Sequence, residues 1–224
     1  MKTIYIILTL LHCMPTIFAQ TKLEGSYFNN ATFEIAIVDT TFYFVIAQGT
    51  HLVFENDTLA KCSIKRIGDN FIELNSEHPV DIVRKSMQIV QEYDTTLVHK
   101  KQVIFDFPCQ RKVEIEVITD NLKYLNLKYS SHNKSLTLPE QTQAFSYIIY
   151  LKEPPMPIFG SVCFSIIQYD PLQEIKFDND KNVIHIYLPA INDTFFERFF
   201  IQGEYARVCG NSINWKGDIF IKSK

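Results

Sequence analysis

The chain has 224 residues, of which 46% are hydrophobic and 13% aromatic, and its formal net charge is −3. This composition supplies ample apolar surface for a core and excludes a chain that is disordered over most of its length. The slightly negative charge and the lack of a basic stripe argue against nucleic acid as a partner.

The N-terminal segment has the features of a secretory signal peptide. Lys2 provides a positive start, residues 4–11 are apolar, and Ala19 offers a small residue for cleavage before Gln20. The apolar stretch is too short for a stable membrane span, and no later apolar segment reaches the roughly 20 residues that a span needs. We expect residues 1–19 to be removed and the protein to reach the periplasm, the cell surface or the extracellular space.

Cys13 raises the alternative of a lipid anchor. Lipoprotein signals place a small residue directly before the acylated cysteine, whereas His12 is bulky and polar. Apolar residues also resume at Ile17 and Phe18, beyond the cysteine. We therefore expect simple cleavage without an anchor at Cys13.

Alternation of apolar and polar residues dominates the rest of the chain, as is typical of half-buried strands. The segments with this pattern are 33–38, 42–47, 102–107, 112–117, 144–151, 183–188 and 217–222. Turn residues such as Gly68-Asp69 separate them. The pattern predicts an all-β fold, either an antiparallel β-sandwich or barrel or two packed small β-modules.

In two segments the spacing of apolar residues does not clearly indicate either a helix or a strand. Residues 80–91 carry apolar residues near helical spacing but also alternate at their C-terminal end, and we expect a strand there. Residues 194–200 contain two Phe doublets and could form a short helix capped by Thr or Asp, so their structure is left open.

Three prolines lie within segment 152–158. Proline fixes φ and cannot donate a ladder hydrogen bond, so this segment is expected to be stiff and extended. We expect it to link an N-terminal β-sandwich region, residues 20–151, to a C-terminal β-module, residues 159–224. The alternative is a crossing between two sheets of one domain.

Short matches in the same order suggest an internal duplication. The paired segments are 39–49 with 193–203, 60–62 with 206–209, and 68–72 with 217–221. The alternative is that an aromatic, strand-rich chain reuses the same turn residues by chance.

Three segments of the first quarter carry a resemblance: Leu-Glu-Gly-Ser-Tyr at 23–27, Asp-Thr-Thr-Phe at 39–42, and the Gly-Asp hairpin at 68–76. Together they are similar to a small β-module of exported proteins from Bacteroidetes-type bacteria. That module has a G-x-Y or G-x-W opening, an aromatic strand and a closing G-D-x-I-x-L hairpin; Cys62 stands where it usually carries a G-T-W strand. The resemblance implies an envelope location and little chemistry.

Glycosylation motifs form a further set of candidates. N-linked acceptor motifs begin at Asn30, Asn56, Asn133 and Asn192. Thr40, Thr58 and Thr95 each follow Asp, which resembles the O-glycosylation sites of Bacteroidetes-type bacteria. The alternative is that these Asp-Thr and Asn-Asp-Thr sequences are ordinary turn residues.

Four cysteines follow the signal segment: Cys62, Cys109, Cys163 and Cys209. An even number in an exported chain permits disulfides, with three possible connectivities. The alternative is that several are small buried apolar residues on strands. Neither their spacing nor the scattered histidines fits a zinc motif.

Catalytic motifs are lacking in the sequence. It contains no G-x-S-x-G, no H-E-x-x-H and no Gly-rich phosphate loop. Glu114 and Glu116 fit a solvated strand face, and residues 178–180 fit a β-turn better than a calcium loop. We expect no catalytic residue, metal or cofactor.

The only tryptophan, Trp215, suggests a binding site. With Tyr205 and Arg207 it could form an aromatic platform for a sugar or peptide. The favoured alternative is a hairpin aromatic side chain packed across a strand pair.

The sequence thus favours a non-catalytic envelope or surface protein that binds a protein or glycan partner. One alternative is a β-barrel carrier of an apolar small ligand, suggested by the 18 Phe. The other is a glycan-active enzyme, which requires two carboxylates facing each other across a groove. The sequence does not indicate the oligomeric state.

Overall fold

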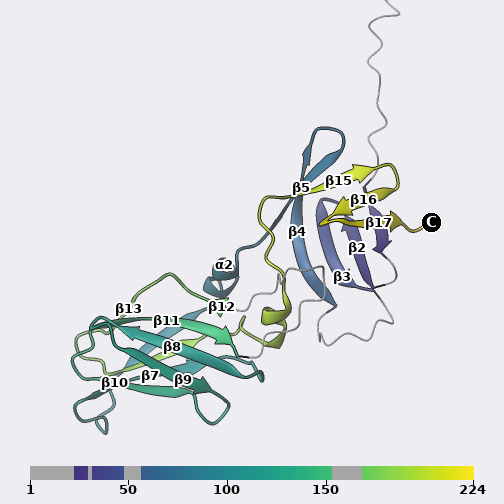
Figure 1. The fold of residues 1–224 in the computed structure, drawn as a ribbon. Coiled ribbons are helices and arrows are strands. Elements are labelled where there is room, and N and C mark those ends of the chain that lie inside the picture. Colours follow the sequence, from purple (N-terminus) through teal and green to yellow (C-terminus); the bar gives the residue numbers. More distant parts are fainter. Residues whose placement is uncertain (1–22, 30–31, 48–56, 153–167) are drawn as a thin grey trace, which may run out of the picture.

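The computed structural model describes residues 23–29, 32–47, 57–152 and 168–224. Several predicted features lie outside these residues: the signal segment 1–19 with Cys13, the acceptors Asn30 and Asn56, Cys163, and residues 153–158 of the Pro-rich segment. The described residues form two strand-rich units joined by two short helical connections (Figure 1). The predicted all-β fold is confirmed.

Eight antiparallel strands form a closed barrel, in the order β1-β17-β16-β15-β5-β4-β3-β2. They are β1 (Gly25–Asn29), β2 (Phe33–Val38), β3 (Thr41–Ile46), β4 (Thr58–Ile67), β5 (Phe71–Ser76), β15 (Glu204–Cys209), β16 (Ser212–Trp215) and β17 (Asp218–Lys222). The first and last strands close the barrel, with Tyr27 opposite Lys222. The barrel is therefore built from the two ends of the described chain.

The remaining strands form two sheets that share one core. They are β6 (Gln88–Glu92), β7 (Lys100–Asp106), β8 (Val113–Thr119), β9 (Tyr124–Tyr129), β10 (Ser135–Pro139), β11 (Ala144–Leu151), β12 (Gln168–Tyr169), β13 (Ile175–Lys176) and β14 (Val183–Tyr187). One sheet has the order β10-β7-β14-β6; in the other, β12-β11-β8-β9 run side by side and β13 also pairs with β11. We call this unit the sandwich.

The strand pairing divides the chain differently from the expected boundary at 152–158. β14 follows the Pro-rich segment in sequence, yet it lies between β6 and β7, which precede that segment. The sandwich is inserted between β5 and β15 of the barrel. The sequence pattern could not reveal this arrangement, because alternation identifies the buried face of a strand and not its hydrogen-bonding neighbour.

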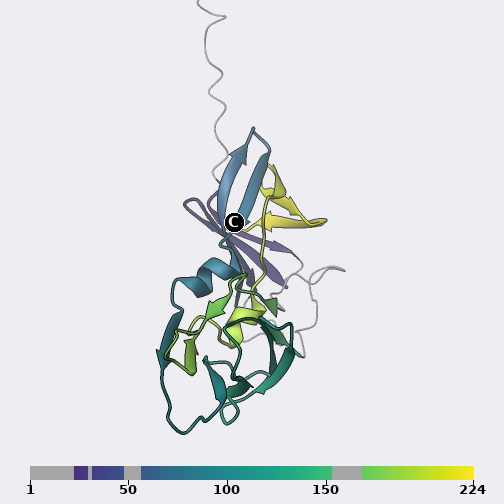
Figure 2. The same cartoon turned by 90° about the vertical axis from the view of Figure 1, so that its left-hand side faces the viewer.

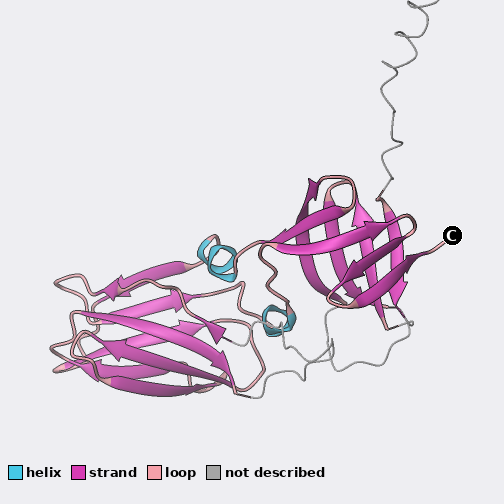
Figure 3. Cartoon of the chain, turned by 45° about the horizontal axis from the view of Figure 1, so that its top comes forward, coloured by secondary structure: helices cyan, strands magenta, loops and turns pink. Residues whose placement is uncertain are grey.

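Two short helices lie between the barrel and the sandwich (Figure 3). Helix α2 (Pro79–Arg84) follows β5, and His78 caps it by accepting a hydrogen bond at Nδ1 from the Val80 N–H at 3.2 Å. The strand expected over 80–91 is therefore wrong for the first half and correct for β6. Proline at the first helical position and a capping side chain before it favour a helix start over strand alternation.

The second connection contains a 3-10 helix, η1 (Asp193–Glu197). Asn192 caps it, accepting a hydrogen bond at Oδ1 from the Phe195 N–H at 2.9 Å. A turned view shows both connections running from the barrel to the sandwich (Figure 2).

The internal matches do not repeat one order of elements. The first match aligns β3 with η1, a strand with a helix. After Cys62, β4 leads directly to the Gly68 turn, whereas β16 intervenes between Cys209 and Gly217. Gly68 and Gly217 both adopt positive φ, as the alternative of reused turn residues expects.

Aromatic rings fill the centre of the barrel. The Trp215 ring lies edge-on to Phe42 and Phe44, with centroids 5.4 and 5.1 Å apart. Phe220 lies edge-on to Phe44 at 6.3 Å, and Phe199 lies 5.7 Å from the same ring. Such contacts combine large apolar burial with favourable ring geometry.

Candidate functional site

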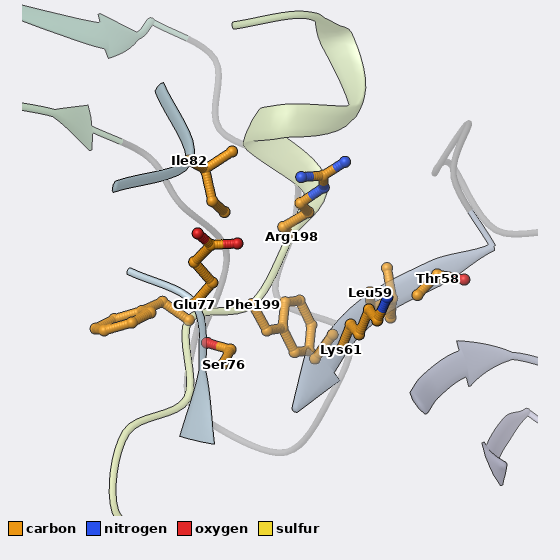
Figure 4. Close-up of a pocket in the computed structure, with 10 residues that line it drawn as sticks. Thr58, Leu59, Lys61, Ser76, Glu77, Ile82, Arg198 and Phe199 are labelled. Carbon is orange, nitrogen blue, oxygen red and sulfur yellow. The ribbon is translucent and has the colours of Figure 1, made fainter. Parts of the chain in front are cut away.

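A cleft of about 230 Å³ lies where the barrel meets the two connections. Its walls come from β4, the end of β5, α2 and the segment after η1 (Figure 4). The lining residues are Thr58, Leu59, Ala60, Lys61, Ser76, Glu77, Ile82, Arg198, Phe199 and Phe200.

Backbone hydrogen bonds fix the wall formed by the segment after η1. The Phe199 N–H donates to the Leu59 carbonyl at 2.6 Å, and the Ser76 N–H donates to the Ile201 carbonyl at 2.8 Å. The Ile201 N–H donates to Ser76 Oγ at 2.9 Å. The segment is therefore bonded to both β4 and the end of β5, and this wall of the cleft is preformed.

Successive phenylalanines of this segment pack on different units. Phe199 is 6% exposed and belongs to the barrel core. Phe200 is half-buried, packs against the sandwich core and lies edge-on to the His78 ring at 4.8 Å. The alternation of an extended backbone thus ties the two units together at the cleft.

The cleft lining has more positively charged than negatively charged side chains. Glu77 forms an ion pair with Lys85, the C-cap residue of α2, and hydrogen bonding to Glu77 raises the pKa of the Lys85 ammonium. Within the described part of the chain, neither Lys61 nor Arg198 has an ion-pair partner; Lys61 Nζ lies 5.7 Å from the centroid of the Tyr43 ring. Two cations are thus available to an anionic ligand.

A more open hollow of about 470 Å³ adjoins the cleft and shares Lys61, Ser76 and Glu77 with it. It is lined by β3, β4 and β5, through Thr40, Thr41, Lys61, Cys62, Ser63, Asn75, Ser76 and Glu77. Hydroxyl and amide side chains form most of this surface. The Cys62 thiol is buried, and burial raises its pKa to about 12, so it offers no thiolate to the hollow near neutral pH.

A buried ion pair holds η1, next to Arg198, against the sandwich. The Glu197 carboxylate is fully buried and accepts a hydrogen bond from the Arg111 guanidinium. One turn earlier, Asp193 Oδ1 accepts from the Gln110 N–H at 2.8 Å and from Cys109 Sγ at 3.2 Å. These contacts fix where the chain leaves the sandwich and so where Arg198 enters the cleft.

The structure does not assemble the aromatic platform predicted around Trp215. Trp215 is 2% exposed inside the barrel, where its Nε1–H donates to Glu204 Oε2 at 3.1 Å. Tyr205 and Arg207 are exposed on the outer face of β15. Trp215 thus lies inside the barrel wall, whereas Tyr205 and Arg207 lie outside it. This arrangement fits the alternative that Trp215 is an aromatic residue packed in the core.

Cys62, Cys109 and Cys209 are free thiols, and no disulfide joins them in the residues that the structure describes. Cys62 and Cys109 are buried, in keeping with the alternative that they are small apolar residues, while Cys209 is exposed. Burial, reinforced by the hydrogen bond to Asp193, raises the pKa of Cys109 to about 12.

The glycosylation candidates occupy different environments. Thr40 is exposed in the turn between β2 and β3, Thr95 is exposed between β6 and β7, and Thr58 lies half-buried at the start of β4 in the cleft wall. Asn192 serves as the cap of η1, and Asn133 is exposed. Thr40 and Thr95 are accessible as a modification requires, and their modification stays a prediction.

No sequence motif pointed to Lys61, Glu77, Ile82 or Arg198. The nearest indication was the unassigned segment 194–200, whose two Phe doublets flank Glu197 and Arg198. The doublets mark a segment packed on both sides, but single charged residues on separate elements form no sequence motif.

Among the described residues, no group of three or more His, Cys, Asp or Glu side chains is placed to hold a metal ion. None of the helices described is long and apolar enough to cross a membrane. Comparison with protein-family models, curated proteins and solved structures found no match to the chain.

Proposed function

We propose that this is an exported, non-catalytic binding protein of the envelope or cell surface, whose ligand occupies the cleft where the barrel meets the two connections to the sandwich. The observation that supports it is the cleft itself, a concave site with apolar walls and a few polar groups at the junction of two units. Ligand sites occur preferentially in such places. The hydrogen-bonded wall at 198–201 favours binding, because its backbone loses little conformational entropy when a ligand binds.

The two alternatives have less support. A carrier of an apolar ligand needs an internal cavity, whereas rings of Phe42, Phe44 and Trp215 contact one another at the centre of the barrel. A glycan-active enzyme needs two facing carboxylates, whereas the cleft lining contributes Glu77, which is paired with Lys85.

Affinity capture from envelope extract tests the proposal, with the captured material analysed for both proteins and glycans. Ile82→Arg places a large charged side chain in the cleft and is expected to reduce ligand retention at least tenfold. Val98→Arg is the matched control, because Val98 is 66% exposed in the loop between β6 and β7 and does not line the cleft.

Circular dichroism melts of both variants check that the fold is kept. Equal retention by Ile82→Arg and the wild type would place binding elsewhere. Failure of the wild type and of Val98→Arg to retain any specific component would overturn the binding role.

A further inference from the structure

We infer that the ligand is an acidic oligosaccharide that places one carboxylate-bearing sugar residue in the cleft and its neighbouring residues over the adjoining hollow. The inference rests on the binding role proposed above and adds the chemical class of the ligand. Three properties of the surface carry it: charge, size and the kind of hydrogen-bonding group that it offers.

Charge is the first property. Lys61 and Arg198 line the cleft from separate elements, and neither has an ion-pair partner among the described residues. Arg198 is half-buried as a residue, and a guanidinium can donate two parallel hydrogen bonds to one carboxylate. Partial exclusion of water strengthens such a contact relative to one on an open surface.

Size is the second property. Drug-sized ligands occupy pockets of roughly 300–1,000 Å³, whereas this cleft measures about 230 Å³. It therefore suits one ring or side-chain-sized group of a longer molecule. Ile82 and Phe200 supply an apolar wall that the C–H face of a sugar ring can cover.

The third property, the kind of hydrogen-bonding group on the surface, favours a sugar over a peptide. An extended peptide binds a sheet mainly through the main-chain groups of a free strand edge. β5 is paired on both sides within the closed barrel, as is β4 at Cys62 and Ser63, which line the hollow. Before Cys62, the Leu59 carbonyl accepts from the Phe199 N–H. Among the described residues, these strands therefore offer a peptide no free edge at the hollow. The hollow instead presents the side-chain hydroxyls of Thr40 and Thr41, and the Ser63 oxygen, whose O–H donates to the Asn75 carbonyl at 3.1 Å, can still accept; such groups suit a ligand rich in hydroxyl groups.

Isothermal titration of the purified protein with defined tetramers tests the inference. The probes are tetramers of galacturonic, mannuronic and guluronic acid and a hyaluronan tetrasaccharide, each compared with its methyl ester. Tetraglutamate represents an acidic peptide. We expect at least one acidic tetramer to bind, its methyl ester to bind at least tenfold more weakly, and tetraglutamate not to compete.

Variants then locate the contact. Arg198→Gln and Lys61→Gln are each expected to weaken binding of the acidic tetramer about tenfold or more. The matched controls are Arg207→Gln, on the outer face of β15, and Lys65→Gln, which lies on β4 with a side chain 71% exposed. Both controls should bind as the wild type does.

Failure of all four acidic tetramers to bind, equal binding of the methyl esters, or stronger binding of tetraglutamate would each overturn this ligand class. Loss of capture by Ile82→Arg in the envelope experiment is a separate result. It would preserve the cleft as the binding site even if the acidic-sugar assignment failed.

Discussion

At the scale of single residues, buried polar groups near the cleft are satisfied by specific partners. Glu197 is fully buried, and a charge in that position is tolerable only with a close counter-charge and hydrogen bonds. Arg111, which lies between β7 and β8 of the sandwich, supplies the counter-charge and a hydrogen bond. The pair therefore fixes an arrangement of the chain more than it adds net stability.

Arg111→Met should destabilise the protein by about 3–5 kcal/mol, because it removes the guanidinium that pairs with the buried Glu197 carboxylate. The double variant Arg111→Met/Glu197→Met should recover much of the loss. Urea unfolding measures both. Lys134→Met is the control, since its ion pair with Asp106 is partly exposed and should cost less than about 1 kcal/mol. A loss as small as that of the control would contradict a structural role for the buried pair.

The cysteines should differ in reactivity. Cys62 and Cys109 have pKa values raised from 9.0 to about 12, chiefly by burial, so they stay protonated and unreactive near pH 8. Of the three cysteines that the structure describes, Cys209 is exposed and should react with a thiol reagent before Cys62 and Cys109 in the native protein. Mass spectrometry of peptides after brief labelling identifies the modified residue. Labelling of Cys62 as fast as Cys209 would show that the barrel opens readily.

The same pKa shifts predict a pH dependence of stability. A group whose pKa is higher in the folded state stabilises the fold fully below its unfolded pKa, and this contribution is lost as pH rises towards the folded value. Stability should therefore fall between about pH 9 and 12. Cys62→Ala/Cys109→Ala should flatten this decline, measured by melting temperature; an unchanged slope would assign it to other groups.

At the scale of elements, the two short helices decide how the cleft is framed. α2 brings Ile82 to one wall, and η1 leads Arg198 to another. Both are too short to be stable alone, so their caps and tertiary contacts must hold them. Asn192 is the clearest case, because its Oδ1 receives both the Phe195 N–H and the Thr194 hydroxyl.

Asn192→Ala should destabilise the protein by about 1 kcal/mol through loss of this cap. Asn192→Asp keeps an oxygen acceptor at the same place and should be close to neutral, although both changes remove the N-glycosylation motif. Thermal unfolding of the unmodified proteins compares them. Equal melting temperatures for the two variants would show that the cap contributes nothing measurable.

At the scale of the whole molecule, the barrel depends on strands from both ends of the described chain. β15 pairs with β5, and β17 pairs with β1, so the C-terminal strands close the gap between two N-terminal edges. The inserted sandwich brings those strands back to the barrel through its two connections. This topology couples the two units at the cleft.

Deletion of residues 204–224 should therefore prevent closure of the barrel. The edges of β1 and β5 would be left unpaired, and such edges promote unfolding or aggregation. Amide hydrogen exchange should show loss of protection across β2–β5 in the truncated chain, compared with the full chain. Retained protection of these strands would mean that the N-terminal sheet is stable without β15–β17.

The sequence by itself determined that the fold is strand-rich, and its alternation located seven of the strands and their buried faces. Residues 33–38 and 144–151 form β2 and β11 with the predicted bounds, because alternating side chains of a strand must face opposite environments. The tertiary structure alone decided which strands are neighbours, where Trp215 points and which charged residues meet at the cleft. Strand pairing uses backbone groups that are the same in every residue, so distant partners such as β1 and β17 leave no local pattern. Lys61 and Arg198 share a site for the same reason: the fold brings them together across a long stretch of chain.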